Sequence, residues 1–408
     1  MNTQPLHNPV FRRLLTYRVL IVLSYQIIGV VVGWHVYELT HDKLALGLIG
    51  LAEVIPYISC ALFAGYAIDH HSRRLFGVMA CVMLCFNALT LLAVAAGFIV
   101  TAPITWIYIS IALNGFARAF FAPTYNALFA LILPREQYAR AAGIGSAAFQ
   151  AGLVIGPALG GLIVGFISKS AAYGVAAVLT LISAAALLSL RVKEPPPAAS
   201  APIFKSIGEG LRFVAGNQIL LGAQALDMFA VLFGGAVAML PAFIDDVFHL
   251  GPEALGLLRA APAIGCIATG ICLARRPLDK HAGRWLLIAV AGFGLCIIGF
   301  ALSAHFLNFW LAAVMLLLSG TCDGVSVVLR STIMQLMTPD IMRGRVAAIN
   351  GIFIGSSNEL GQFESGVAAR FMGLIPSVIF GGMMTLGIVG TTAKLAPKLR
   401  RLHLGQLQ

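Results

Sequence analysis

Charged side chains are scarce in this sequence. Only 11% of its 408 residues are Asp, Glu, Lys or Arg, whereas 59% are hydrophobic and the mean hydropathy is +0.92. Soluble globular proteins contain about 25% charged residues. A soluble chain of this length could not bury so much apolar surface and still present a polar exterior. The composition therefore excludes a soluble enzyme, a disulfide-rich scaffold and a disordered chain, and it indicates a polytopic membrane protein.

Several chemical motifs are also missing. The sequence has no phosphate-binding P-loop, which argues against direct drive by ATP. Its seven cysteines all fall inside apolar stretches, and no His or further Cys accompanies the close pair Cys81 and Cys85. We interpret them as small packing residues and expect neither a metal site nor a cofactor. His35 and Glu38 come nearest to a catalytic set, but without a third group the sequence does not predict an enzyme.

Long apolar segments dominate the chain. Each is about 20–25 residues long, enough for an α-helix to cross a hydrocarbon core of about 30 Å and too long for barrel strands. The sequence predicts about twelve of them, at 17–39, 45–68, 75–98, 103–130, 141–167, 171–190, 219–245, 254–275, 284–304, 309–333, 344–369 and 373–395. The first lacks a small-residue cleavage signal, so we expect it to be retained. The predicted fold is an all-α bundle of about twelve transmembrane helices.

Lysine and arginine lie mainly on one side of these segments. With the N-terminus placed inside, the outer segments hold only Lys43, Lys169 and Arg370 of the 27 basic residues. Most of the others, Arg18 among them, lie in the inner segments. The positive-inside rule then predicts that both termini are cytoplasmic. The formal net charge of +11 is interpreted as a cytoplasmic rim rather than a nucleic-acid-binding surface.

A proline-rich interruption divides the chain. Three consecutive prolines begin at Pro195, and proline cannot continue a helix, so a semi-rigid linker is expected there. The predicted domains are an N-terminal six-helix half at 1–190, a cytoplasmic linker at 191–218 and a C-terminal six-helix half at 219–408.

The two halves resemble each other in sequence. An offset of 205 residues carries Pro134 onto Pro339 and Arg140 onto Arg345. Matching glycines are Gly115 and Gly320, Gly156 and Gly361, Gly161 and Gly366, and, with an offset of 209, Gly47 and Gly256. Duplicated halves place a substrate site near mid-membrane, which rocking of the halves opens to either side. The architecture predicts a transporter.

Two short motifs carry further information. The loop after the second predicted helix contains Gly65, Asp69, Arg73 and Arg74. We expect Gly65 to allow close helix approach and Asp69 to form an ion pair that holds one conformation as a gate. The alternative is a basic loop that only sets the topology.

The second motif lies in the fifth predicted helix. Its residues are Gly143, Gly152, Gly156, Pro157, Gly160 and Gly161. Small residues at helical spacing let backbones pack closely, and a proline loosens or bends a helix.

With these motifs the chain resembles the major facilitator superfamily across essentially its full length. The loop at 65–74 resembles the superfamily signature between the second and third helices, with His70 and Ser72 as departures, and the fifth-helix pattern matches that of its proton-coupled antiporters. The stretches 227–235 and 359–366 resemble the branch of enterobactin-type siderophore exporters. The resemblance implies a monomeric inner-membrane antiporter that exports a siderophore or a drug-like (multidrug) solute in exchange for protons.

Charges inside the predicted helices give a second route to the site, because each costs at least about 2.5–3.5 kcal/mol at a helix centre. We expect Asp227, Glu359 and Asp323 to couple proton movement, since a low-dielectric cavity disfavours a charged carboxylate. For Glu359, the alternative is a carboxylate held by its neighbours Ser356 or Asn358. The predicted substrate cavity comprises Glu53, Arg118, Tyr25, Gln26, Asn114, Asn126, Asn358 and Glu364.

Three arginines in the predicted helices receive separate interpretations. Arg118 and Asp323 are equivalent under the offset of 205, and we predict that they meet across the cavity, with a permanent structural pair as the alternative. Arg259 and Arg330 lie nearer the ends of their predicted helices and are expected to extend their charged groups to the membrane surface.

Two other classes of function remain open at this point. A facilitator or an importer of a small metabolite would share the architecture without proton-coupled export. A non-transporting membrane receptor would tolerate neutralisation of Asp227, Asp323 and Glu359.

Overall fold

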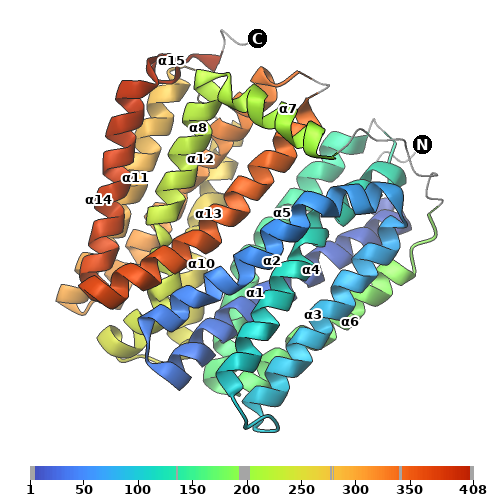
Figure 1. The fold of residues 1–408 in the computed structure, drawn as a ribbon, viewed down its shortest axis with the longest axis vertical. Helices are drawn as coiled ribbons and strands as arrows, with labels where there is room; N and C mark the ends of the chain where they lie inside the picture. Colours follow the sequence, from blue (N-terminus) through green and yellow to red (C-terminus); the bar gives the residue numbers. More distant parts are fainter. Residues whose placement is uncertain are drawn as a thin grey trace. The chain divides into compact units, whose positions relative to one another are not determined.

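The computed structural model is almost entirely helical (Figure 1), and it describes residues 5–134, 137–192, 203–275, 278, 280–339 and 342–404. The first six long helices are α1 (Pro9–Thr40), α2 (Lys43–His70), α3 (Arg73–Ala95), α4 (Pro103–Ile132), α5 (Tyr138–Phe166) and α6 (Lys169–Leu188). The later ones are α8 (Gln218–Phe233), α10 (Pro252–Arg275), α11 (Ala282–Ser303), α12 (Phe309–Met337), α13 (Arg343–Met372) and α14 (Leu374–Leu395). No strand occurs in the ranges given above.

Membrane-length helices account for each predicted apolar segment. Eleven helical stretches within the described residues are long and apolar enough to cross a membrane. The twelfth predicted segment corresponds to α13, a 30-residue helix whose charged and amide side chains make it more polar than the others. The prediction of an all-α membrane protein with about twelve transmembrane helices is confirmed.

Short polar side chains begin several helices. Ser72 accepts a hydrogen bond from the Leu75 backbone N–H (3.3 Å) at the start of α3, and Ser168 accepts one from Ala171 N–H (3.0 Å) at the start of α6. Such caps satisfy backbone donors that have no partner within the helix. They explain why these helices begin where they do.

Two elements differ from the sequence-based prediction. The segment predicted as one helix over 219–245 ends as an α-helix at Phe233, and irregular helical turns follow to Phe248, because Gly234 and Gly235 weaken the helix and Pro241 lacks a donor. The predicted linker contains a helix, α7 (Ile203–Ala215). The prolines of the linker lie outside the described residues.

Contacts group the chain into two compact units. Unit 1 comprises Met1–Thr40, Ala52–Ser200 and Gly251–Ala260, and unit 2 comprises His41–Leu51, Ala201–Leu250 and Ala261–Gln408. The first residues of α2 and of α10 therefore belong to a different unit from the rest of those helices. The predicted halves, 1–190 and 219–408, assign these two segments differently.

Each unit contains a close glycine contact that involves one of these two segments. In unit 1, a Cβ built on Gly161 of α5 would lie 2.6 Å from the Cα of Gly256 in α10. In unit 2, a Cβ built on Gly47 of α2 would lie 2.8 Å from the Cα of Gly366 in α13. The sequence repeat relates Gly161 to Gly366 and Gly47 to Gly256. The same glycine crossing thus occurs once in each unit.

Candidate functional site

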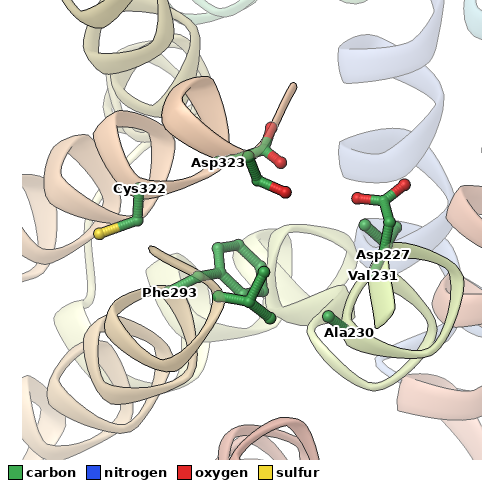
Figure 2. A pocket seen from close by; sticks show the side chains of 8 residues that line it. Asp227, Ala230, Val231, Phe293, Cys322 and Asp323 are labelled. Carbon is green, nitrogen blue, oxygen red and sulfur yellow. The ribbon is translucent and has the colours of Figure 1, made fainter. Parts of the chain in front are cut away.

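Two acidic residues from different helices line one small pocket in unit 2 (Figure 2). Asp227 comes from α8 and Asp323 from α12, and the remaining lining residues are Ala230, Val231, Val290, Phe293, Cys322 and Ser326. The pocket has room for about one water molecule. Two residues that we predicted to couple proton movement therefore share one polar spot in an otherwise apolar setting.

An arginine from α12 completes this acidic pocket. The Nη1 atom of Arg330 lies 2.5 Å from Oδ2 of Asp227, and its Nε donates a hydrogen bond to Ser326 Oγ (3.2 Å). Arg330 is only 8% exposed and Asp227 only 5%. The expectation that Arg330 extends to the membrane surface is wrong, because α12 continues for about two turns beyond it and the carboxylate of α8 satisfies its charge inside.

The charges in the acidic pocket do not balance. Two carboxylates, those of Asp227 and Asp323, face a single guanidinium among the ion pairs that the structure describes. Transfer of an unpaired charge out of water is costly, so the second carboxylate requires either a proton or a share of Arg330. This imbalance is the main chemical property of the pocket.

Glu359 occupies a different place, on α13. It is 4% exposed, and its Oε2 accepts a hydrogen bond from Gln362 Nε2 (2.7 Å) one turn further along the helix. The expected donors Ser356 and Asn358 instead donate to the backbone carbonyls of Ile352 (2.6 Å) and Ile354 (2.8 Å). The idea that these neighbours hold the Glu359 carboxylate is therefore wrong.

A second charged cluster lies in unit 1. Arg118 Nη1 of α4 lies 3.1 Å from Glu53 Oε1 of α2, and the hydroxyl of Tyr25 in α1 donates to the same oxygen at 2.7 Å. The Arg118 guanidinium also lies 4.9 Å from the centroid of the Tyr57 ring. Gly115 contributes by lacking a side chain, because a Cβ there would overlap the backbone of Glu53. Three predicted cavity residues thus meet in one cluster.

The other predicted cavity residues are dispersed. Gln26 packs its Cβ against Gly156, and Asn114 is buried with no hydrogen-bond partner for its carbonyl oxygen. Asn126 and Asn358 are exposed, and Glu364 is half-buried. Arg259 donates to the Gly29 carbonyl (3.4 Å) within unit 1. The predicted contact between Arg118 and Asp323 stays a prediction.

The loop between α2 and α3 is only partly described. Among the described residues, a Cβ on Gly65 would meet nothing within 4 Å, and the expectation that this glycine allows a close helix approach stays a prediction. Arg74 Nη1 donates to the Leu190 carbonyl at 2.8 Å, and Arg73 is the first residue of α3. The side chain of Asp69 lies outside the described part of the chain, and its gating role stays a prediction.

The glycines of α5 pack against α1. A Cβ on Gly152 would lie 2.7 Å from Cγ1 of Val22, and one on Gly156 would lie 2.6 Å from Cβ of Gln26. Gly160 faces the backbone of Ile27, whereas Gly143 has nothing within 4 Å. Pro157 lies inside the helix, and its carbonyl is next to the α10 crossing.

Sequence reasoning missed one residue. Arg18 was grouped with the cytoplasmic rim, but it lies nine residues inside α1, where its guanidinium carbon is 3.9 Å from the centroid of the Tyr125 ring. Its spacing of seven residues from Tyr25 places both on one face of the helix, and this periodicity was the available signal.

A bundle of membrane-length helices with acid–arginine pairs buried in it defines a polytopic membrane protein of the transporter class. The model of the Major Facilitator Superfamily matches residues 14–361, and the chain belongs to this superfamily of transporters. The sequence-based resemblance is confirmed.

Known proteins extend this assignment. The chain is similar to the enterobactin exporter EntS of Escherichia coli O1:K1 / APEC, with 26% identity over 406 residues that cover 94% of this chain and 92% of the relative. Its fold is similar to that of a D-xylose–proton symporter, with a TM-score of 0.76, 12% identity and coverage of 98% and 100% of the two chains. A bacterial homologue of the human lysosomal transporter Spinster has a TM-score of 0.71, 16% identity and coverage of 97% of each chain.

Proposed function

We propose that this transporter exports a small organic solute, a siderophore or a drug-like compound, across the inner membrane in exchange for protons. It works by alternating access as a monomer in the lipid bilayer, with both termini in the cytoplasm. The similarity to an enterobactin exporter over nearly the whole chain supports export. The excess of basic residues in the predicted inner segments supports the orientation.

The single observation that carries the proton coupling is the acidic pocket. Arg330 neutralises Asp227, and Asp323 faces the same small space without a cation of its own among the described ion pairs. A proton on Asp323 leaves the Asp227–Arg330 pair intact. Loss of that proton creates a carboxylate that competes for Arg330 and so disturbs the contact between α8 and α12. Proton occupancy and helix contact are coupled in this way.

The first test is solute flux driven by an imposed pH gradient in inverted membrane vesicles, with a panel of siderophores and cationic dyes. Asp323→Asn is the sharpest variant, because it removes a proton site while Asp227 remains to pair with Arg330. We expect it to abolish gradient-driven flux and to retain solute exchange. Glu359→Gln tests the second candidate acid, and Glu38→Gln, which alters an exposed pair with Lys169, is the matched control.

Each other outcome has a clear meaning. Unchanged coupling in both Asp323→Asn and Glu359→Gln means that the acid assignments are wrong. Solute flux that does not depend on the pH gradient in the native protein indicates a facilitator. Absence of any solute flux, together with tolerance of neutral substitutions at Asp227, Asp323 and Glu359, indicates a receptor.

A further inference from the structure

Another arginine in unit 1, Arg18, lies close to two aromatic rings. Arg18 is about 14 Å along α1 from its first residue, at 1.5 Å per residue. Its guanidinium carbon lies 3.9 Å from the centroid of Tyr125 on α4 and 5.3 Å from that of Phe149 on α5. Three helices therefore contribute one side chain each to a cationic spot with apolar walls.

Two buried polar atoms of this spot make no hydrogen bond. The Nε atom of Arg18 is buried and makes no hydrogen bond, and the same holds for the hydroxyl of Tyr125, a side chain that is 5% exposed. Arg18 lies next to that hydroxyl, over the face of the Tyr125 ring. Buried donors without acceptors are rare in folded proteins and call for an explanation.

The charge of Arg18 is also uncompensated in the described structure. Arg118 pairs with Glu53 and Arg330 pairs with Asp227, whereas the ion pairs of the described residues include no carboxylate beside Arg18. Arg18 belongs to the apolar segment predicted over 17–39 and is partly buried. An arginine in such a segment normally pairs with an acid, lines a polar cavity or marks a substrate path. Since no described carboxylate pairs with Arg18, a ligand that brings a negative oxygen would complete the site.

The backbone of α5 makes room for this arrangement. A Cβ on Gly145 would overlap the hydroxyl oxygen of Tyr125, so glycine is the residue that lets the phenol reach this position. Gly145 lies on α5, the helix whose glycines pack against α1. The site is thus built into the helix contacts of unit 1.

We propose that Arg18, Tyr125 and Phe149 form a binding subsite for a small organic anion. An oxyanion such as a carboxylate bonds to the guanidinium, because planar guanidinium groups match carboxylates. The apolar body of the ligand lies against the rings. The proposal rests on the proposed export function and adds to it the charge class of the solute.

Three aromatic probes of similar size test the charge class. Benzoate is an anion, benzamide is its neutral counterpart and benzylamine is a cation. Binding is measured by titration calorimetry on the full chain in phosphatidylcholine nanodiscs, which contain no anionic lipid. We expect benzoate to bind at least about tenfold more tightly than the other two, since hydrogen bonds to charged groups are the strong ones. Equal binding of the three probes overturns the proposal.

Four variants test the residues. Arg18→Gln is expected to weaken benzoate binding at least about tenfold, and Tyr125→Phe, which removes only the hydroxyl, about fivefold. Arg18→Lys keeps the charge but loses the planar donors, so it should retain the preference for benzoate over benzylamine with weaker binding. The control is Arg12→Gln, an exposed arginine earlier on the same helix, which should bind as the native protein does.

Other results separate the subsite from its alternatives. Equal benzoate binding by Arg18→Gln and Arg12→Gln overturns the subsite. An Arg18→Gln variant that loses only binding of phosphatidylglycerol, in nanodiscs that contain it, shows a lipid contact instead and also overturns the subsite. If Arg18→Gln fails to fold, the comparison of the three probes on the native protein decides.

The subsite and the export function can fail independently. Gradient-driven flux of cationic dyes without benzoate binding overturns the subsite and leaves proton-coupled export in place. Arg18-dependent binding of benzoate without any gradient-driven flux supports the subsite and removes the export function.

Discussion

Buried charges in this protein meet their partners on other helices. Glu53 of α2 is held by Arg118 of α4 and by the Tyr25 hydroxyl of α1, and Asp227 of α8 is held by Arg330 of α12. Removal of one member of a buried pair leaves the other as an uncompensated charge, which costs more than the pair itself contributes. The stability of these clusters therefore depends on both members together.

The Asp227–Arg330 pair gives a prediction at the scale of residues. Arg330→Gln should destabilise the protein by about 3–5 kcal/mol, because it leaves Asp227 buried without its counterion. Asp227→Asn should destabilise it less, because Asp323 still faces Arg330. The double variant should be less destabilised than the sum of the two. Thermal unfolding in detergent, with the four proteins compared in a double-mutant cycle, measures the coupling. Strictly additive effects would contradict the pairing.

The Tyr25 hydroxyl gives a smaller effect. Tyr25→Phe removes one hydrogen bond to Glu53 Oε1 and leaves the ion pair with Arg118 in place. We expect a loss of about 1.5–3 kcal/mol, the range for a hydrogen bond to a charged group. The midpoint of thermal unfolding measures it. Tyr138→Phe is the control, because it removes a hydroxyl that donates to the Ala130 carbonyl (2.8 Å) and not to Glu53.

At the scale of helices, glycine positions control packing unequally. In α5, Gly152 touches Val22 of α1 closely, whereas Gly143 has free space around it, although both belong to the same motif. A motif matched in sequence therefore contains positions with different physical roles. The sequence shows the spacing of the glycines, but the neighbouring helix determines which of them needs to be small.

This difference predicts opposite outcomes for one substitution. Gly152→Ala should lower stability by about 1–3 kcal/mol, because the added methyl group overpacks the contact with α1. Gly143→Ala should be neutral or slightly stabilising, since alanine favours a helix over glycine. Expression level and thermal unfolding of the two variants check this prediction. Equal destabilisation of the two variants would show that the α1–α5 contact does not cause the loss of stability in Gly152→Ala.

Two elements show why helix prediction from sequence is incomplete. Hydropathy predicts an apolar segment over 219–245, but it does not register that Gly234 and Gly235 end α8, where a Cβ on Gly235 would meet the carbonyl of Gly361 on α13. The prolines near 195 led to a predicted linker over 191–218, so the helix α7 within it was not predicted. There, Arg345 pairs with Glu209 at 2.5 Å, so the helix is held by α13 through a contact distant in sequence.

At the scale of the whole molecule, the orientation in the membrane is open to a direct test. In a variant without the seven native cysteines, Thr101→Cys lies in the loop before α4 and Ser189→Cys lies just after α6, and both parent residues are exposed. An impermeant maleimide added to intact cells should label the first and not the second, because the basic residues predict an inner position for the end of α6. The reverse pattern would invert the topology.

Local properties of the sequence suffice for the class of this protein. Apolar length sets the number of spans, basic residues predict the orientation, and repeated glycines reveal the duplication, since each is a feature of neighbouring residues or of a simple offset. The pairing of charges depends on which helices lie next to each other. Arg330 was expected at the membrane surface but pairs with Asp227, and Arg18 was grouped with the rim but stacks on Tyr125. Hydropathy cannot predict such contacts, because it is summed over the residues of one helix, whereas the partner side chain is on another helix.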